Sequence, residues 1–248
     1  RRREEGPRGG MEPFTEPPPG RRRIRAGPGP KAPRRTIEAT RHAEETGADA
    51  ALVVVPYYNK PTQDGLLAHY RAIAESSALP LVLYNVPGRT GISMTAETTL
   101  RLAQLPTVAA IKEACGSLDQ VSEIVGGAPA GFTVLSGDDS LTLPMLSVGA
   151  EGVISVAGNI VPGAIAALTE AGLRGDYPSA REIHFSLFDL MRAMFIENNP
   201  TAVKTAAAML GLCSDDVRLP LTAMSAANRA RVASALEQCL YTRRPIAA

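Results

Sequence analysis

A regular alternation of strand-like and helix-like segments between residues 36 and 174 is the feature that most constrains the fold. Helical periodicity separates five short apolar segments, which we predict to be strands: Ala51–Val55, Leu81–Val86, Val108–Lys112, Phe132–Ser136 and Gly152–Val156. Each unit takes roughly 28 residues, and strands alternating with helices at this spacing are typical of βαβ units in a parallel sheet. The sequence therefore predicts an α/β fold of the (β/α)8 barrel type, with about five strands present.

The pattern changes near residue 175. After that point three segments have apolar residues at helical spacing, and no strand-like segment is found: Ala180–Ile196, Pro200–Leu210 and Thr222–Leu240. Their apolar faces need another surface to pack on. We therefore predict a partial barrel over residues 36–174 and a C-terminal helical extension over residues 175–248.

Residues 1–35 have a different composition from the rest of the chain. They hold eight Pro, six Gly and eleven basic residues against four Glu. We expect this segment to be disordered, because it has no apolar periodicity. A basic arm for nucleic acid or a membrane is one interpretation. A transit peptide is another, although the segment has no Ser. A third is a stretch read in the wrong frame, since this bias is typical of GC-rich codons read out of frame.

The remaining residues argue against several classes of function. From residue 36 onward the chain carries 15 basic and 21 acidic residues, a mild net negative charge that does not favour a nucleic-acid-binding body. The three cysteines and three histidines lack metal-binding spacing, so we expect no metal, and free thiols in a reducing cytoplasm. No apolar run reaches the ~18 residues of a membrane span.

Lys112 is the most informative candidate for a catalytic residue. It ends the apolar strand Val108–Lys112, at the end of the sheet where barrel enzymes place their active sites. A buried lysine tends to lose its proton, and its neutral amine can attack a carbonyl to form an imine. The alternative is a structural lysine paired with Glu113. Position alone does not separate these two interpretations.

Further polar residues follow the neighbouring strands. Tyr84 lies within its strand, where it could relay protons or be a core tyrosine with one hydrogen bond. Arg89 follows in a Pro-Gly-Arg-Thr-Gly turn and could hold a carboxylate or be a solvated loop arginine. Tyr58 could pack at a subunit contact. Gly137 and Asp138 could bind substrate, although capping is the usual role of an Asp before a helix.

Six motifs occur in an order that resembles the dihydrodipicolinate synthase and N-acetylneuraminate lyase family of aldolase-like barrels. They are Pro-Tyr-Tyr-Asn, Tyr-Asn-Val-Pro-x-Arg-Thr-Gly, Ile-Lys-Glu-Ala, Leu-Ser-Gly-Asp-Asp, Gly-Val-Ile-Ser-Val and Asn-Pro-x-x-Val-Lys. The resemblance runs from about Thr36 to the C-terminus. It implies a lyase that condenses pyruvate with aspartate semialdehyde to 4-hydroxy-tetrahydrodipicolinate in lysine and diaminopimelate biosynthesis.

The resemblance also implies residue roles. Lys112 would form the imine with pyruvate, with no other cofactor, and Tyr84 would be the proton-relay tyrosine. Tyr58 would reach across a dimer interface into the partner's relay, and Arg89 would hold the carboxylate of aspartate semialdehyde. The backbone at Ile154 would contact pyruvate. Gly137 and Asp138 are expected to bind substrate because of their position after a strand. A cytoplasmic homodimer or homotetramer is expected, with no nucleic-acid or membrane partner.

One departure from the family pattern affects the expected activity. Full members have three further strands before residue 36, and one of them carries a Gly-Thr-Thr-Gly-Glu loop that is not found here. The expectation is therefore an N-terminally incomplete barrel with impaired activity. Two alternatives stay open, namely another Schiff-base aldolase acting on a sugar-derived keto acid and a non-catalytic barrel fragment.

Overall fold

The computed structural model describes residues 24–27 and 33–241. Its centre is one sheet of six parallel strands, and each described strand after the first pairs with the strand before it in the chain. The strands are β1 Ile24–Gly27, β2 Ala50–Val54, β3 Leu81–Asn85, β4 Val108–Glu113, β5 Thr133–Ser136 and β6 Gly152–Val153. The five predicted strands are confirmed, with one-residue differences at the ends of β2 to β5, but β6 ends at Val153 rather than at the predicted Val156.

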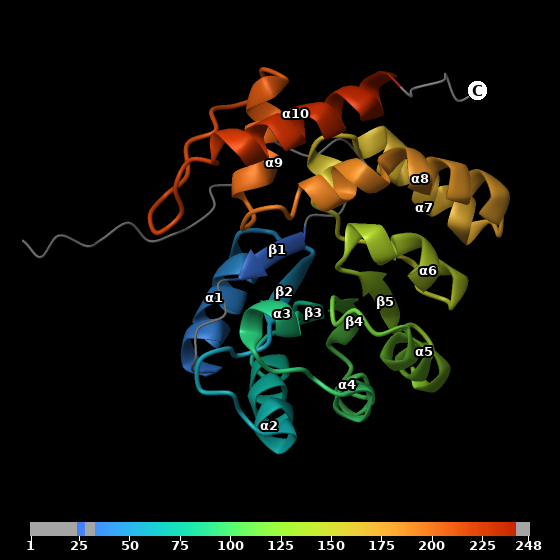
Figure 1. The fold of residues 1–248 in the computed structure, drawn as a ribbon. Coiled ribbons are helices and arrows are strands. Elements are labelled where there is room, and N and C mark those ends of the chain that lie inside the picture. The colour runs from blue at the N-terminus through green and yellow to red at the C-terminus, as the bar shows by residue number, and fades with distance from the viewer. Residues whose placement is uncertain (1–23, 28–32, 242–248) are drawn as a thin grey trace, which may run out of the picture.

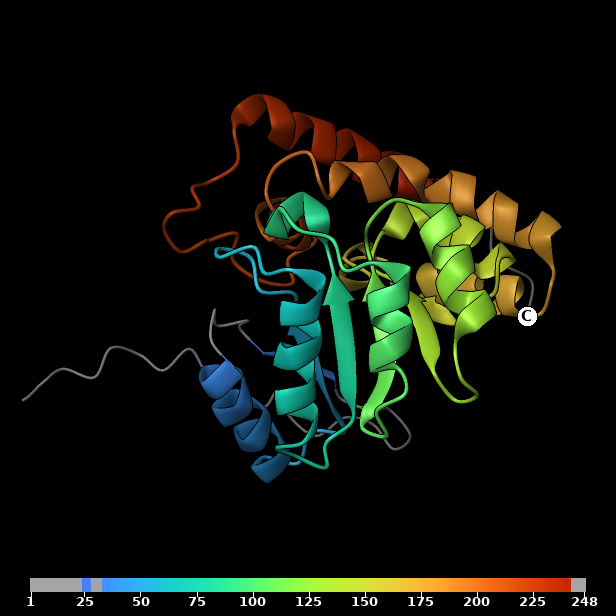
Figure 2. The same cartoon turned by 90° about the horizontal axis from the view of Figure 1, so that it is seen from below.

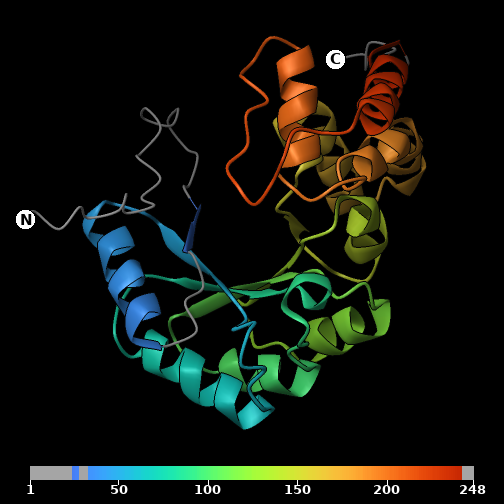
Figure 3. The same ribbon diagram turned by 60° about the vertical axis from the view of Figure 1, so that its left-hand side comes forward.

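Helices connect the strands along one face of the sheet. The longer ones are α1 Pro33–Glu45, α2 Gln63–Ala74, α4 Ala96–Leu102, α5 Leu118–Gly127 and α6 Thr142–Ser147. Figure 3 shows α1, α2, α4 and α5 in an arc along the same side of the sheet, and Figure 2 shows them in chain order. A sheet whose strands follow the chain order, with the helices outside, is the arrangement of a (β/α) barrel rather than of a doubly wound sheet.

The two faces of the sheet have different environments. The main apolar cluster lies between the sheet and the outer helices and includes Val53, Leu83 and Ile111. A much smaller cluster of Leu52, Val82 and Ala110 lies on the opposite, inner face. Side chains alternate between faces along a strand, so the residues two positions further on, Tyr84 and Lys112, also belong to the inner face.

The C-terminal helices form a second apolar core. Helices α7 Pro162–Leu173, α8 Tyr177–Ala193, α9 Thr201–Met209 and α10 Ala226–Tyr241 bury residues such as Leu168, Leu187, Leu190 and Val232 against one another. Figure 1 shows these helices together, above the sheet and its outer helices. Helix α7 thus shares its core with the predicted extension, although the sequence placed it in the barrel. None of the described helices is long and apolar enough to span a membrane.

Two differences from the sequence expectations concern the start of the chain. Strand β1 lies inside the segment 1–35, where no strand was expected, and pairs with β2 in parallel register. Helix α1 begins at Pro33 rather than at Thr36. The prediction of disorder for residues 1–23 and 28–32 concerns positions outside the described residues. The sheet therefore has six described strands rather than five.

Candidate functional site

The candidate catalytic residues meet at the C-terminal ends of β3 and β4. Tyr84 and Lys112 are directly opposite each other in the parallel register of these strands. The Lys112 Nζ atom lies 4.2 Å from the centroid of the Tyr84 ring, a cation–π distance. Lys112 is only 8% exposed, whereas Tyr84 is half-buried. The strand register therefore places the amine and the phenol at one point on the inner face.

Burial changes the proton affinity of the Lys112 amine. Desolvation lowers the pKa of Lys112, the nearby charge of Arg89 lowers it further, and the charge of Asp139 opposes both. Among the described residues no ion pair of Lys112 is found. A larger fraction of the amine is consequently neutral near pH 7 than for an exposed lysine, and the neutral form is the nucleophile.

The Tyr84 phenol responds to burial in the opposite direction. Desolvation raises the pKa of Tyr84, the Arg89 charge lowers it in part, and the Asp138 charge raises it. The hydroxyl group therefore stays protonated near neutral pH and can donate a proton to a bound molecule.

Arg89 lies on α3, a helical turn over Pro87–Thr90, where the sequence indicated only a turn. The turn ends at Gly91, whose φ of 67° lies in the left-handed region that favours glycine. The Arg89 side chain is exposed, and its charge acts on both Lys112 and Tyr84. A cation thus stands at the solvent side of the lysine–tyrosine pair, where it can attract an anionic molecule.

The backbone after β5 and β6 completes the inner end of the site. The Gly137 backbone N–H donates to the Glu113 carbonyl at 2.7 Å, and the Ile154 N–H donates to the Ser136 carbonyl at 2.9 Å. Ile154 packs against the same inner cluster as Tyr84. The structure therefore brings Gly137 and Ile154 to the end of the sheet that carries Lys112.

The two aspartates after β5 have different environments. Asp138 makes no side-chain capping bond, contrary to the usual role of an Asp before a helix, and instead its Oδ1 accepts from Ser140 Oγ at 3.2 Å. Asp139 is 1% exposed, and its Oδ2 accepts from the backbone N–H groups of Val156 and Ala157 at 3.1 and 2.8 Å. Sequence reasoning selected Asp138, but Asp139 is the residue that links the ends of β5 and β6.

Two tyrosines that follow β2 face outward. Tyr58 is 73% exposed and Tyr57 is 45% exposed. Large exposed aromatic side chains are enriched at protein–protein interfaces. The prediction that Tyr58 serves a partner subunit's relay stays a prediction.

A groove of about 680 Å³ runs beside β6 and α7. Its lining includes Leu135, Ile154, Ser155 and Ile165, but neither Lys112 nor Tyr84. Of the predicted site residues, only Ile154 borders both this groove and the inner cluster. We place the chemistry at the lysine–tyrosine pair because the perturbed amine and phenol lie there.

The alternative of a structural ion pair between Lys112 and Glu113 is wrong. The two residues are adjacent on β4, so their side chains point to opposite faces. Glu113 accepts hydrogen bonds from Asn85, Gln120 and the Cys115 backbone instead. Sequence reasoning missed Asn85 and Gln120. The sequence did hold a signal for Asn85. It directly follows Tyr84, as Glu113 directly follows Lys112, so the two polar residues are at equivalent positions on neighbouring strands.

Comparisons with known proteins agree with this geometry. The model of the Dihydrodipicolinate synthetase family matches residues 18–239. The 4-hydroxy-tetrahydrodipicolinate synthase of Thermomicrobium roseum is 53% identical over 223 residues, which cover 90% of this chain and 74% of that protein. The synthase of Geobacter sulfurreducens is 52% identical and covers 86% of this chain and 73% of that protein.

Solved structures give the same result. The crystal structure of dihydrodipicolinate synthase from Aquifex aeolicus has a TM-score of 0.84 at 48% identity, covering 87% of this chain and 73% of that chain. The structure from Thermotoga maritima has a TM-score of 0.85 at 39% identity, covering 87% and 74%. Since the family match begins at residue 18, the expectation that the resemblance starts near Thr36 is wrong.

Proposed function

This chain belongs to the dihydrodipicolinate synthetase family, and on that premise we propose that it condenses pyruvate with aspartate semialdehyde, using Lys112 as the covalent nucleophile. Family membership makes it a carbon–carbon lyase of the class I aldolase type. The single observation that best supports the role of Lys112 is its buried position on the inner face, opposite Tyr84 and without an ion-pair partner among the described residues.

The chemistry follows from an amine of lowered pKa. The neutral Lys112 amine attacks the keto carbon of pyruvate, and loss of water gives a protonated imine. The imine draws electrons from the adjacent methyl carbon, which loses a proton and becomes an enamine. The enamine carbon then bonds to the aldehyde carbon of the second substrate, whose oxygen takes up a proton. Attack of the substrate's own amine on the imine carbon finally releases Lys112.

The other residues have supporting roles in this proposal. The protonated Tyr84 hydroxyl supplies and recovers protons during the exchange of water and the formation of the new bond. Arg89 binds the carboxylate of aspartate semialdehyde from the solvent side. Gly137, Asp138 and Ile154 line the pyruvate site. The exposure of Tyr58 supports a homo-oligomer in which this residue meets a partner subunit.

The test is reductive trapping of the imine. The protein is incubated with pyruvate and borohydride, digested and analysed by mass spectrometry. We expect irreversible added mass on the peptide that contains Lys112, none in Lys112→Ala, and unchanged labelling in Lys204→Ala, since Lys204 binds the Asp216 backbone carbonyl in the C-terminal region. Labelling at Lys204 instead, or labelling that persists in Lys112→Ala, would contradict the proposal.

A further inference from the structure

Glu113 is a buried carboxyl group that faces away from the candidate site. It is 1% exposed, and four contacts from neutral N–H donors reach its two oxygens. Asn85 Nδ2 lies 3.0 Å from Oε1 and 3.1 Å from Oε2. The Cys115 backbone N–H donates to Oε1 at 2.9 Å, and Gln120 Nε2 donates to Oε2 at 3.0 Å. Within the described part of the chain, no cation pairs with this carboxyl group.

Burying this carboxyl group has an energetic cost. Removing a carboxylate from water is unfavourable, and neutral donors compensate less than a cation does. Burial accordingly raises the pKa of Glu113, although the bonds from Asn85, Gln120 and Cys115 oppose this rise. Apolar side chains at positions 85 and 113 would avoid this cost, but they would leave the Met94 and Cys115 backbone N–H groups and the Gln120 amide without these partners. The cost of burying Glu113 is thus offset by a network that joins β3, β4 and α5.

The network lies directly behind the lysine–tyrosine pair. Asn85 and Glu113 are opposite each other in the register of β3 and β4, one residue beyond Tyr84 and Lys112. Backbone hydrogen bonds continue this connection, since the Ala114 N–H donates to the Asn85 carbonyl at 2.9 Å. A backbone shift that changes the distance between β3 and β4 at Asn85 and Glu113 consequently also changes the distance between Tyr84 and Lys112.

Asn85 also closes the loop that carries Arg89. The Met94 N–H donates to Asn85 Oδ1 at 3.0 Å, and Asn85 Nδ2 lies 3.2 Å from the Met94 carbonyl oxygen. Gln120 Nε2 donates to the same carbonyl at 3.0 Å. Residues 86–93, which include α3 and Arg89, thus form a loop. Asn85 hydrogen-bonds to Met94 at the far end of this loop and to Glu113, so it joins the two ends of the loop and links them to β4.

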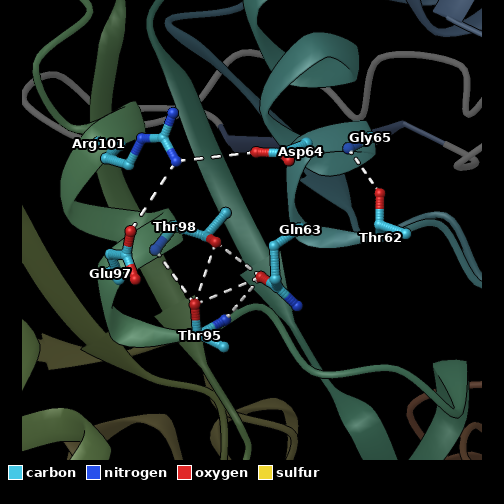
Figure 4. A network of polar contacts seen from close by, with 8 residues as sticks. All are labelled: Thr62, Gln63, Asp64, Gly65, Thr95, Glu97, Thr98 and Arg101. Atoms are coloured by element: carbon cyan, nitrogen blue, oxygen red, sulfur yellow. Dashed lines mark hydrogen bonds and ion pairs between the residues drawn. The ribbon is translucent and has the colours of Figure 1, made fainter.

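A second network holds the same segment from outside. Gln63, at the start of α2, donates from Nε2 to the Ser93 carbonyl at 2.9 Å. Its Oε1 accepts from the Thr95 N–H at 3.2 Å and from Thr98 Oγ1 at 2.7 Å. Figure 4 shows the Gln63 side chain at the start of α2 in contact with Thr95 and Thr98 at the start of α4. The end of the Arg89 loop is therefore held by Gln63 on one side and by Asn85 on the other. Because Asn85 also binds Glu113, the loop is linked to β4.

We infer that Glu113 and Asn85 form a buried positioning pair, which fixes Lys112, Tyr84 and the Arg89 loop in one mutual geometry. Neither residue touches substrate in this scheme. Both act through the strand ends and the loop closure described above. The relevance of the pair to catalysis rests on the proposed function, but its effect on Lys112 is measurable without any substrate.

The test uses variants that alter hydrogen-bond polarity and keep side-chain shape. Each Glu113 oxygen accepts from Asn85 and from one further donor. In Glu113→Gln the new NH₂ group therefore meets other N–H donors in either orientation of the amide, and hydrogen bonds are lost. In Asn85→Asp, two carboxyl groups face each other. The double variant Asn85→Asp with Glu113→Gln restores one donor and one acceptor across the strands. Glu197→Gln is the matched control, because Glu197, in the bend after α8, also accepts from an asparagine amide, that of Asn228 on α10, at 2.8 Å.

The first readout is trace acylation of lysine amines across pH, with the Lys112 peptide quantified by mass spectrometry against the Lys204 peptide. In both single variants we expect the titration midpoint of Lys112 to rise toward the ordinary lysine value by at least about half a pH unit, because water reaches a displaced amine. The second readout is the rate of pyruvate trapping, which should fall by about tenfold to a hundredfold. The double variant should recover part of both effects, and Glu197→Gln should match wild type.

The outcomes separate cleanly. The positioning pair would be overturned if the single variants had the wild-type Lys112 titration midpoint and the wild-type rate of pyruvate trapping. It would also be overturned if the double variant recovered neither quantity. If a single variant loses its cooperative thermal transition, Gln120→Met at a half-buried position replaces it, and the same shift in the Lys112 midpoint is required. A wild-type chain that forms no pyruvate adduct contradicts the proposed function alone, because the acylation readout still tests the pair.

Discussion

Gly137 packs against Lys112 so closely that no side chain fits between them. A Cβ atom at position 137 would lie 3.0 Å from Lys112 Cε, 3.1 Å from Lys112 Cγ and 2.9 Å from the Cβ of Ala114. The lysine side chain could bend away from such an atom, whereas Ala114, on the backbone directly after β4, could not. The glycine therefore leaves the space that the Lys112 side chain occupies beside the end of β5.

This contact predicts a specific defect in Gly137→Ala. The added methyl group should displace the Lys112 amine, and a displacement of about 1 Å lowers reaction rates by about a hundredfold. Overpacking should also destabilise the fold by about 1–3 kcal/mol. Pyruvate trapping and thermal unfolding measure the two effects. Gly126→Ala is the control, because a Cβ there meets nothing within 4 Å, and equal trapping by the two variants would refute the steric argument.

Tyr84→Phe should separate imine formation from turnover. The ring that packs against the Lys112 amine is retained, and only the protonated hydroxyl group is lost. We expect kcat for the condensation to fall by about 10²–10⁴, the usual effect of losing a positioned proton donor. Borohydride should still label Lys112 after prolonged incubation with pyruvate. Unchanged kcat would assign Tyr84 a packing role only.

Arg89→Ala should weaken the binding of the second substrate. The loss of a charge-assisted contact to a carboxylate corresponds to a rise in KM for aspartate semialdehyde of about tenfold to a hundredfold, with pyruvate trapping little changed. Steady-state kinetics with each substrate varied in turn measure this difference. Arg101→Ala is a matched control, since Arg101 pairs with Asp64 and Glu97 on the surface. An unchanged KM for aspartate semialdehyde would favour another keto-acid aldolase of the family.

Stability should depend on pH through His69, which is 7% exposed and whose pKa is lowered by burial from the usual 6.5 to about 4. Well above pH 6.5 neither the folded nor the unfolded state holds this proton. As the pH falls toward 4, the unfolded state binds a proton that the folded state does not. Stability contributed by neutral His69 is therefore lost across this window, by at most about 1.4 kcal/mol per pH unit.

Urea unfolding of wild type and His69→Gln, compared between about pH 7 and pH 4.5, isolates this contribution. The wild type should lose more stability over the window than the variant does. His184 shifts in the same direction and is present in both proteins, so the difference between them reports on His69 alone. Parallel curves would show that the buried imidazole does not carry the effect.

The repeating part of the fold was predictable because its signals are local. Apolar segments such as Val108–Lys112 are buried on both faces of a parallel sheet, and such strands are recognisable as continuous apolar runs. Strand β1 was missed because Ile24–Gly27 holds one large apolar residue among Arg, Ala and Gly, and only its pairing with β2 makes it a strand. The turn α3 was missed because Pro-Gly-Arg-Thr is equally typical of a turn.

The site was predictable only in part. The position of Lys112 at a strand end indicated its chemistry, and alternation along the strand could have separated it from Glu113. The contact of Asn85 with Met94 closes a loop, and the contact of Asp139 with Ala157 joins two strand ends. No local sequence pattern encodes either contact. Tertiary structure alone reveals which buried polar residues support the lysine.

Every strand pairing in this sheet joins neighbours along the chain, from β1 to β6 in order. A protein synthesised from its N-terminus, at about 5–20 residues per second, can therefore add each strand to the edge of those already released by the ribosome. No pairing in the described sheet has to wait for a distant segment. Protease resistance of ribosome-bound chains should accordingly increase stepwise with each completed βα unit, rather than at once when the C-terminal helices emerge.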